Sequence, residues 1–209
     1  MPIKFTPVSD NYEKQQTYKE LINKYNKAIQ YEFYYEAILI DYALMEDRLR
    51  SCIYYLGLLT DRNAIKISKN KAKKTIKLWM ERCFPEEKSE FRISSISGKR
   101  KIVITALLHF QSGVMLSEDN TYEGTVYKCL KRKNDNITEA IEYFHKCEEW
   151  CDYRNEIIHC LFNKQSPEVQ EKLEQLATDG MKIARYFDKI CSWFKWRSII
   201  RKFLKLKTE

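Results

Sequence analysis

The segment of this chain best suited to chemistry is Arg154-Asn155-Glu156-Ile157-Ile158-His159. An imidazole that titrates near neutral pH can move a proton, and a guanidinium can hold a phosphate through two N–H groups. An amide can orient the imidazole or a phosphate oxygen. In a helix, Asn155 and His159 are four residues apart and share one face. Together with Arg154 they offer what metal-free cleavage of RNA needs, proton transfer at the 2′-hydroxyl and charge stabilisation at the phosphate.

Arg154 stands out because it falls within an apolar stripe of its predicted helix. A guanidinium does not lose its charge, so burying it without a partner is costly. We therefore expect Arg154 to reach solvent, to pair with an acid, or to line a cleft or subunit interface. The stripe comprises Ala140, Phe144, Cys147, Cys151, Ile158 and Leu161, with Trp150 at its edge.

The pattern Arg154-Asn155-x-x-x-His159, late in a helical chain, resembles the signature of HEPN domains (higher eukaryotes and prokaryotes nucleotide-binding). These all-α domains occur in toxins, phage-defence proteins and CRISPR-linked ribonucleases. The resemblance implies a homodimer with one composite active site, no metal or other cofactor, and RNA cleavage that leaves a cyclic phosphate and a 5′-hydroxyl. It assigns His159 as general acid and base, Arg154 as phosphate clamp and Asn155 as orienter. A partner antitoxin or other regulatory protein is a further implication.

The resemblance also implies an acidic residue from an early helix that contacts the arginine. Glu46 and Asp47 are the candidates, and Glu46 lies closer to the apolar face of its helix. We expect Glu46 to be the partner, although an acid that merely flanks the core would show the same pattern. Some HEPN toxins carry a Tyr two residues after the His, where this chain has Leu161, so control through that tyrosine is not expected.

The composition predicts one all-α domain. The chain has 209 residues, of which only 5 are Gly and 4 are Pro, and this argues against a β-sandwich. We expect a single HEPN-like domain over residues 1–209, an up-and-down helical bundle with long N- and C-terminal helices. The absence of a signal peptide and of long apolar stretches predicts a cytoplasmic protein without stable membrane insertion. Seven Cys, an odd number, favour reduced thiols in that compartment.

Capping residues and apolar periodicity place the helices. The first segment, 11–59, is either one helix or two joined near Asn23 to Asn26. Its second half carries a stripe of Ile38, Tyr42, Met45, Leu49, Ile53 and Leu56. Further helices are predicted over 68–84, 101–112 (ending at Gly113), 121–133, 137–163 and 167–205, the last with Gly180 as a weak point.

Other features support different functions. Cys147, Cys151 and His145 invite a zinc interpretation, but the spacing lacks a second ligand pair. The net charge of +8 favours a polyanionic partner. A non-catalytic module that binds RNA or a protein is the main alternative, and the basic, aromatic segment 193–209 also fits a membrane-surface helix. Basic clusters that could together guide RNA lie at 69–77, 99–101, 131–133 and 195–207.

Overall fold

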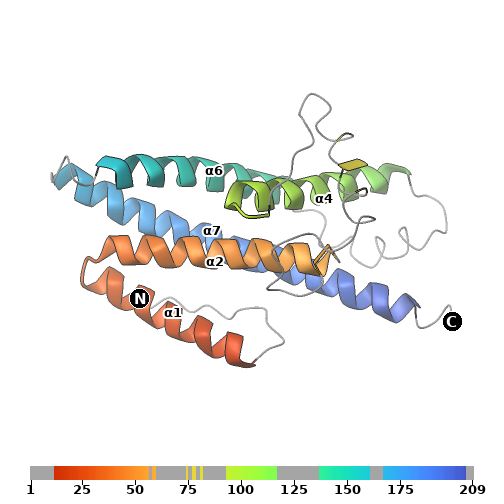
Figure 1. Cartoon of the computed structure of the whole chain (residues 1–209), viewed down its shortest axis with the longest axis horizontal. Coiled ribbons are helices and arrows are strands. Elements are labelled where there is room, and N and C mark those ends of the chain that lie inside the picture. The colour runs from red at the N-terminus through yellow and green to blue at the C-terminus, as the bar shows by residue number, and fades with distance from the viewer. Residues whose placement is uncertain are drawn as a thin grey trace. The chain divides into compact units, whose positions relative to one another are not determined.

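The described part of the chain is all-α, as predicted. The computed structural model describes residues 12–56, 58–59, 74, 77–78, 81, 93–116, 137–160 and 167–205. Its helices are α1 (Tyr12–Gln30), α2 (Tyr34–Tyr55), α4 (Ile96–Leu116), α6 (Ile137–Cys160) and α7 (Pro167–Lys205) (Figure 1). Across these ranges, no helix is both long and apolar enough to span a membrane. The helices predicted over 68–84 and 121–133 lie largely or wholly outside the described residues.

The chain divides into two compact units. Unit 1 comprises residues 1–47 and 145–189, and unit 2 comprises residues 48–144 and 190–209. Helices α2, α6 and α7 therefore each contribute residues to both units, whereas α1 belongs to unit 1 and α4 to unit 2. All four predicted site residues fall in unit 1.

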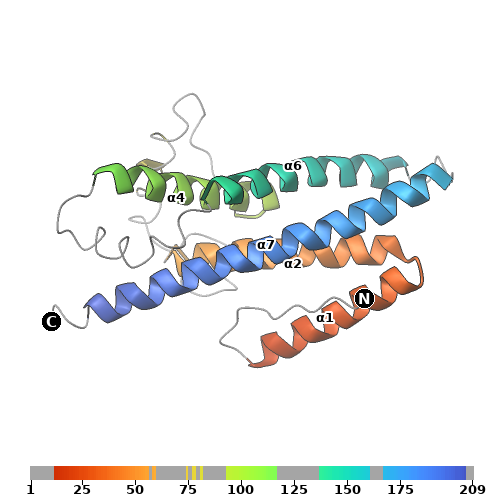
Figure 2. The same ribbon diagram turned by 180° about the vertical axis from the view of Figure 1, so that it is seen from behind.

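A tight turn separates α1 from α2, so the prediction of a junction near Asn23 to Asn26 was wrong. The backbone N–H of Phe33 donates to the carbonyl of Ala28 at 2.7 Å, and that of Glu32 to Ile29 at 3.2 Å. These bonds, with Glu32 at a φ of 59°, form the Schellman motif that ends many helices. Glycine usually takes this left-handed position, and Glu32 therefore gave no sequence signal. Figures 1 and 2 show α1 and the first part of α2 side by side and antiparallel.

Polar side chains from α1 join it to the other helices of unit 1. The buried Tyr25 hydroxyl donates to the carbonyl of Ala177 on α7 at 3.1 Å. Nearer the start of α1, Tyr18 and Lys14 both donate to the carboxylate of Asp47 on α2. The apolar faces of the four helix segments supply the remaining core.

In unit 2, α4 begins earlier than predicted because Ser95 caps it. The Ser95 hydroxyl accepts a hydrogen bond from the backbone N–H of Gly98 at 3.1 Å, as an N-cap residue does. The helix also runs through Gly113 to Leu116, so the predicted end was wrong. Lys99 and Arg100 are buried, and Arg100 donates to the carbonyl of Phe144 at 2.8 Å. The basic cluster at 99–101 is therefore mainly structural and offers little surface for RNA.

The long helix α7 begins at Pro167, as predicted, and continues through Gly180 without interruption. A Cβ atom at Gly180 would lie 2.6 Å from Oδ2 of Asp41 and 2.9 Å from Cζ2 of Trp150. The glycine therefore allows α2 and α6 side chains to pack directly against the backbone of α7 within unit 1.

Candidate active site

Arg154 lies half-buried on α6 between aromatic rings. Its guanidinium carbon is 4.2 Å from the centre of the Tyr42 ring on α2 and 6.0 Å from that of Trp150. Its Nη2 donates to Oδ1 of Asn155 at 2.6 Å. Among the described residues, the guanidinium forms no ion pair with a carboxylate. Stacking on rings, rather than pairing with an acid, is thus how this helix accommodates the charge.

The structure places Asn155 beside Arg154, where its amide oxygen accepts a hydrogen bond from the guanidinium. His159 belongs to the last turn of α6, but its side chain lies outside the described residues. At about 100° per residue, His159 is roughly 40° from Asn155 and roughly 140° from Arg154 around the helix. The structure therefore brings two of the three motif residues into contact, and the contact links the amide to the guanidinium.

Glu46 is connected to this site through Tyr42. Burial raises the pKa of the Tyr42 phenol, the charge of Glu46 raises it further, and the charge of Arg154 lowers it. Both charged residues thus act on the same ring. Asp47 is instead engaged by Lys14 and Tyr18 of α1. Of the two candidate acids, Glu46 is the one whose charge reaches the site.

Tyr42 is a site residue, although its place in the apolar stripe of α2 predicted a core residue. The other stripe residues Ile38, Met45 and Leu49 are buried, whereas Tyr42 is half-buried at the edge. Its spacing of four residues from Glu46 could have indicated a shared face of α2. Nothing in the sequence indicated that Arg154 would lie over its ring, because that contact depends on how α2 and α6 pack.

Asp41, which the sequence did not mark as a functional residue, is buried among helices of unit 1. It is 0% exposed, and neither carboxylate oxygen has a hydrogen-bond partner. Desolvation raises the pKa of Asp41 well above its usual range. The titratable group linked to it from α1 is Tyr25, whose own pKa is raised first by burial and then by the charge of Asp41. Oδ2 of Asp41 lies close to the backbone of α7 at Gly180, and the ring of Trp150 on α6 approaches the same point of α7; neither of these two residues titrates.

This burial predicts a pH-dependent stability. An acid whose pKa is raised in the folded state stabilises the fold fully below the unfolded pKa of about 3.9, and this stability is lost as pH rises through the folded pKa. We expect Asp41→Asn to be progressively more stable than the parent above about pH 4. Urea unfolding followed by circular dichroism across pH measures this difference. Asp152→Asn, an exposed control on α6, should follow the parent, and a constant gap for Asp41→Asn at all pH values would contradict the prediction.

Among the described residues, no three or more His, Cys, Asp or Glu side chains are grouped so that they could hold a metal ion. Cys147 is buried with its sulfur 3.9 Å from that of Met45, and His145 is exposed. The zinc interpretation gains no support from this geometry.

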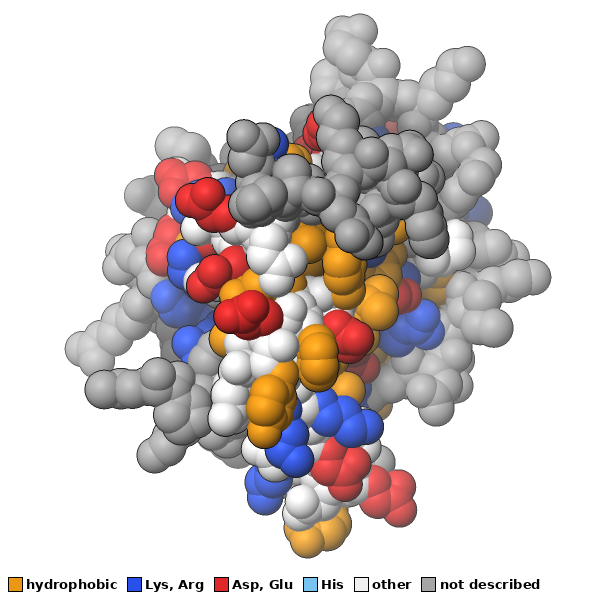
Figure 3. Space-filling model, turned by 90° about the vertical axis from the view of Figure 1, so that its left-hand side faces the viewer, with side chains coloured by type: hydrophobic (Ala, Val, Ile, Leu, Met, Phe, Trp, Pro, Cys, Tyr) orange, Lys and Arg blue, Asp and Glu red, His pale blue; other side chains and the backbone are white. Residues whose placement is uncertain are grey.

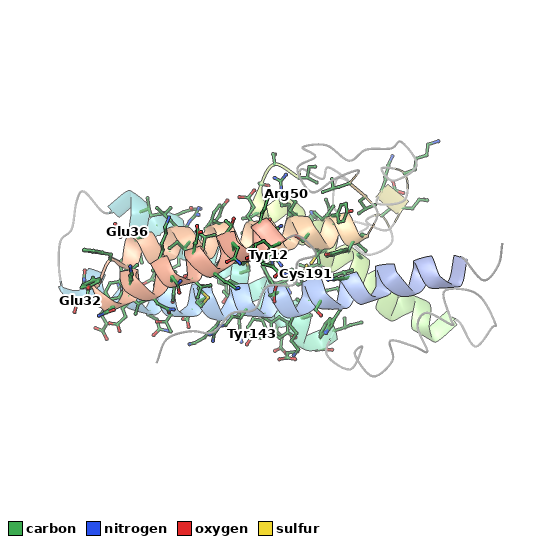
Figure 4. The ribbon with its side chains drawn as sticks, turned by 90° about the horizontal axis from the view of Figure 1, so that it is seen from below. Tyr12, Glu32, Glu36, Arg50, Tyr143 and Cys191 are labelled. Atoms are coloured by element: carbon green, nitrogen blue, oxygen red, sulfur yellow. The ribbon has the colours of Figure 1, made fainter. Side chains whose placement is uncertain are left out.

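The surface near the α1–α2 turn mixes charged and apolar side chains. Tyr31, Phe33 and Leu39 are 60%, 57% and 60% exposed, and the rings of Tyr31 and Phe33 lie 6.2 Å apart. Glu32 and Glu36 are located at the same end of α1 and α2 (Figure 4). In Figure 3, acidic, basic and hydrophobic side chains are interspersed, and neither charge forms a continuous surface on the described part of this face.

Comparisons of the chain with protein-family models, with curated proteins and with solved structures gave no match. The geometry around Arg154 and the motif to which it belongs are therefore the features that point to a function.

Proposed function

We propose that this chain is a metal-independent endoribonuclease of the HEPN type, acting as a toxin or phage-defence effector. The observation that carries the proposal is the half-buried Arg154, held by a ring and an amide with no carboxylate against it among the described residues. A guanidinium that no acid neutralises keeps its full attraction for a phosphate. His159 follows on the same helix as the group for proton transfer.

The reaction transfers protons without a cofactor. His159 takes the proton from a ribose 2′-hydroxyl, whose oxygen then attacks the adjacent phosphorus. The bond from phosphorus to the 5′-oxygen breaks as that oxygen receives a proton from a second imidazole. The products are a 2′,3′-cyclic phosphate and a 5′-hydroxyl. Arg154 stabilises the negative charge that develops on the phosphoryl oxygens, and Asn155 fixes the orientation of the guanidinium.

The second imidazole requires a second copy of the chain. In this proposal a homodimer joins two copies of the motif into a composite site, so that one His159 acts as base and the other as acid. The enzyme works in the cytoplasm, where RNA is its substrate and an antitoxin or other regulatory protein restrains it.

Cleavage of single-stranded RNA in the presence of EDTA tests the proposal. We expect EDTA-resistant cleavage with cyclic phosphate ends, reduced by at least about 100-fold in His159→Ala, because a general acid–base group contributes about 10²- to 10⁴-fold. His145→Ala is the matched control, an exposed histidine on the same helix, and should keep full activity. Cleavage that EDTA abolishes, or that persists in His159→Ala, would refute the assignment.

A non-catalytic module that binds a protein partner is a second candidate. The exposed apolar side chains Tyr31, Phe33 and Leu39 favour it, because such groups recur at protein interfaces. RNA that stays intact after long incubation with the purified protein would favour this function over the ribonuclease.

A further inference from the structure

The guanidinium of Arg154 is restrained on several sides, and the restraints differ in kind. Its Nε atom is buried and has no hydrogen-bond partner, whereas Nη2 donates to the exposed Asn155. The central carbon of the group, Cζ, lies over the Tyr42 ring at 4.2 Å from its centre. A hydrogen bond to Asn155 limits rotation in the plane, and the ring limits tilting out of it.

The helices around this contact are anchored to the core of unit 1. Trp150, one turn before Arg154 on α6, donates its indole N–H to the carbonyl of Leu176 on α7 at 2.7 Å. Its ring also packs at the backbone of α7, where Gly180 has no side chain. On α2, Ile38 lies one helical turn before Tyr42 and Met45 lies about one turn after it, and both are buried. Both the guanidinium and the ring beneath it are therefore carried by packed helices.

We propose that Tyr42 is the positioning residue of this site, and that its aromatic face holds the guanidinium of Arg154 in the orientation that receives a phosphate. Tyr42 acts through Arg154, the charged group that lies over its ring. Burial and the charge of Glu46 raise the pKa of its phenol, and the charge of Arg154 acts in the opposite direction. Cation–π attraction uses the face of the ring and does not require the hydroxyl. A side-chain hydrogen bond also links the Tyr42 hydroxyl to Arg154, and Tyr42→Phe removes that bond while keeping the ring. The consequence for catalysis rests on the proposed function, whereas the restraint on Arg154 does not.

Nuclear magnetic resonance of the Arg154 side chain tests the restraint without any RNA. Ring currents shield protons above an aromatic face, so the Nε–H proton of Arg154 should shift downfield in Tyr42→Leu. Tyr42→Phe, which keeps the ring, should leave that resonance in place, and Arg154→Lys assigns it by its disappearance. A resonance that does not move in Tyr42→Leu would overturn the proposal.

RNA cleavage tests the consequence. We expect Tyr42→Leu to lower kcat by about tenfold with KM nearly unchanged, within the range that cation–π contacts of roughly 0.5–2 kcal/mol allow. Tyr42→Phe should retain activity within about twofold. In an Arg154→Ala background, Tyr42→Leu should add no further loss, because its effect passes through the arginine.

The two proposals fail in different ways. If the Arg154 resonance shifts in Tyr42→Leu but no RNA is cleaved by the parent protein, the restraint of Arg154 by Tyr42 stands and the ribonuclease proposal fails. If the parent cleaves RNA and Tyr42→Leu adds its full loss to that of Arg154→Ala, Tyr42 is a structural residue and the positioning role fails.

Discussion

Arg154→Ala should slow RNA cleavage by about two to three orders of magnitude, which is the usual loss when one preorganised donor to a developing oxyanion is removed. Arg154→Lys should recover only a small part of this loss. A lysine keeps the positive charge but has neither the planar face that stacks on Tyr42 nor the paired N–H groups that hold a phosphate. Single-turnover cleavage with excess enzyme measures both variants.

The matched control for Arg154 is Arg185→Ala, an exposed arginine on α7 of the same unit. It removes the same charge and should leave the cleavage rate within about twofold, because long-range effects of an exposed charge are screened by salt. Unfolding curves for Arg154→Ala should stay within about 1–2 kcal/mol of the parent, the scale of a cation–π contact. Full activity in Arg154→Ala would remove the central support for the ribonuclease.

Substitution of Gly180 should have the largest effect on stability. A Cβ atom at this position would approach Asp41 to 2.6 Å and Trp150 to 2.9 Å, closer than packed atoms tolerate. Overpacking of this kind costs about 1–3 kcal/mol. The preference of alanine over glycine in a helix offsets roughly 1 kcal/mol of that cost. We expect Gly180→Ala to lose about 1–2 kcal/mol of unfolding free energy and Gly180→Val to lose more than about 3 kcal/mol.

A double-mutant cycle identifies the contact responsible. In an Asp41→Ala background, which removes the nearest oxygen, Gly180→Ala should cost about 1 kcal/mol less than in the parent. Thr178→Ala, at an exposed position on α7, is the control and should be neutral or slightly stabilising. A parent protein that gains stability from Gly180→Ala would show that α7 does not approach α2 as closely as the structure places it.

Much of the fold followed from local patterns. Low glycine and proline content, the stripe from Ile38 to Leu56 and the Ser166-Pro167 start predicted an all-α chain and the bounds of α7. These signals act within a few residues along the chain, through capping and apolar periodicity. The errors arose at two residues that did not behave as their type usually does at a helix end. Glu32 ended α1 in the position that glycine normally occupies, and Gly113 failed to end α4.

The candidate site also has features that the sequence predicted and features that only the packing of the helices decided. The type and spacing of Arg154, Asn155 and His159 could be read from the chain, because residues of one helix have a known angular relationship. The ring beneath Arg154 and the buried carboxylate of Asp41 could not be predicted in this way. The contact of Arg154 with Tyr42 and the approach of Asp41 to Gly180 each join helices whose residues are more than 100 positions apart in sequence. Such contacts are decided by how the helices pack. At Gly180, a residue without a side chain, α2 and α6 side chains can approach the backbone of α7 closely.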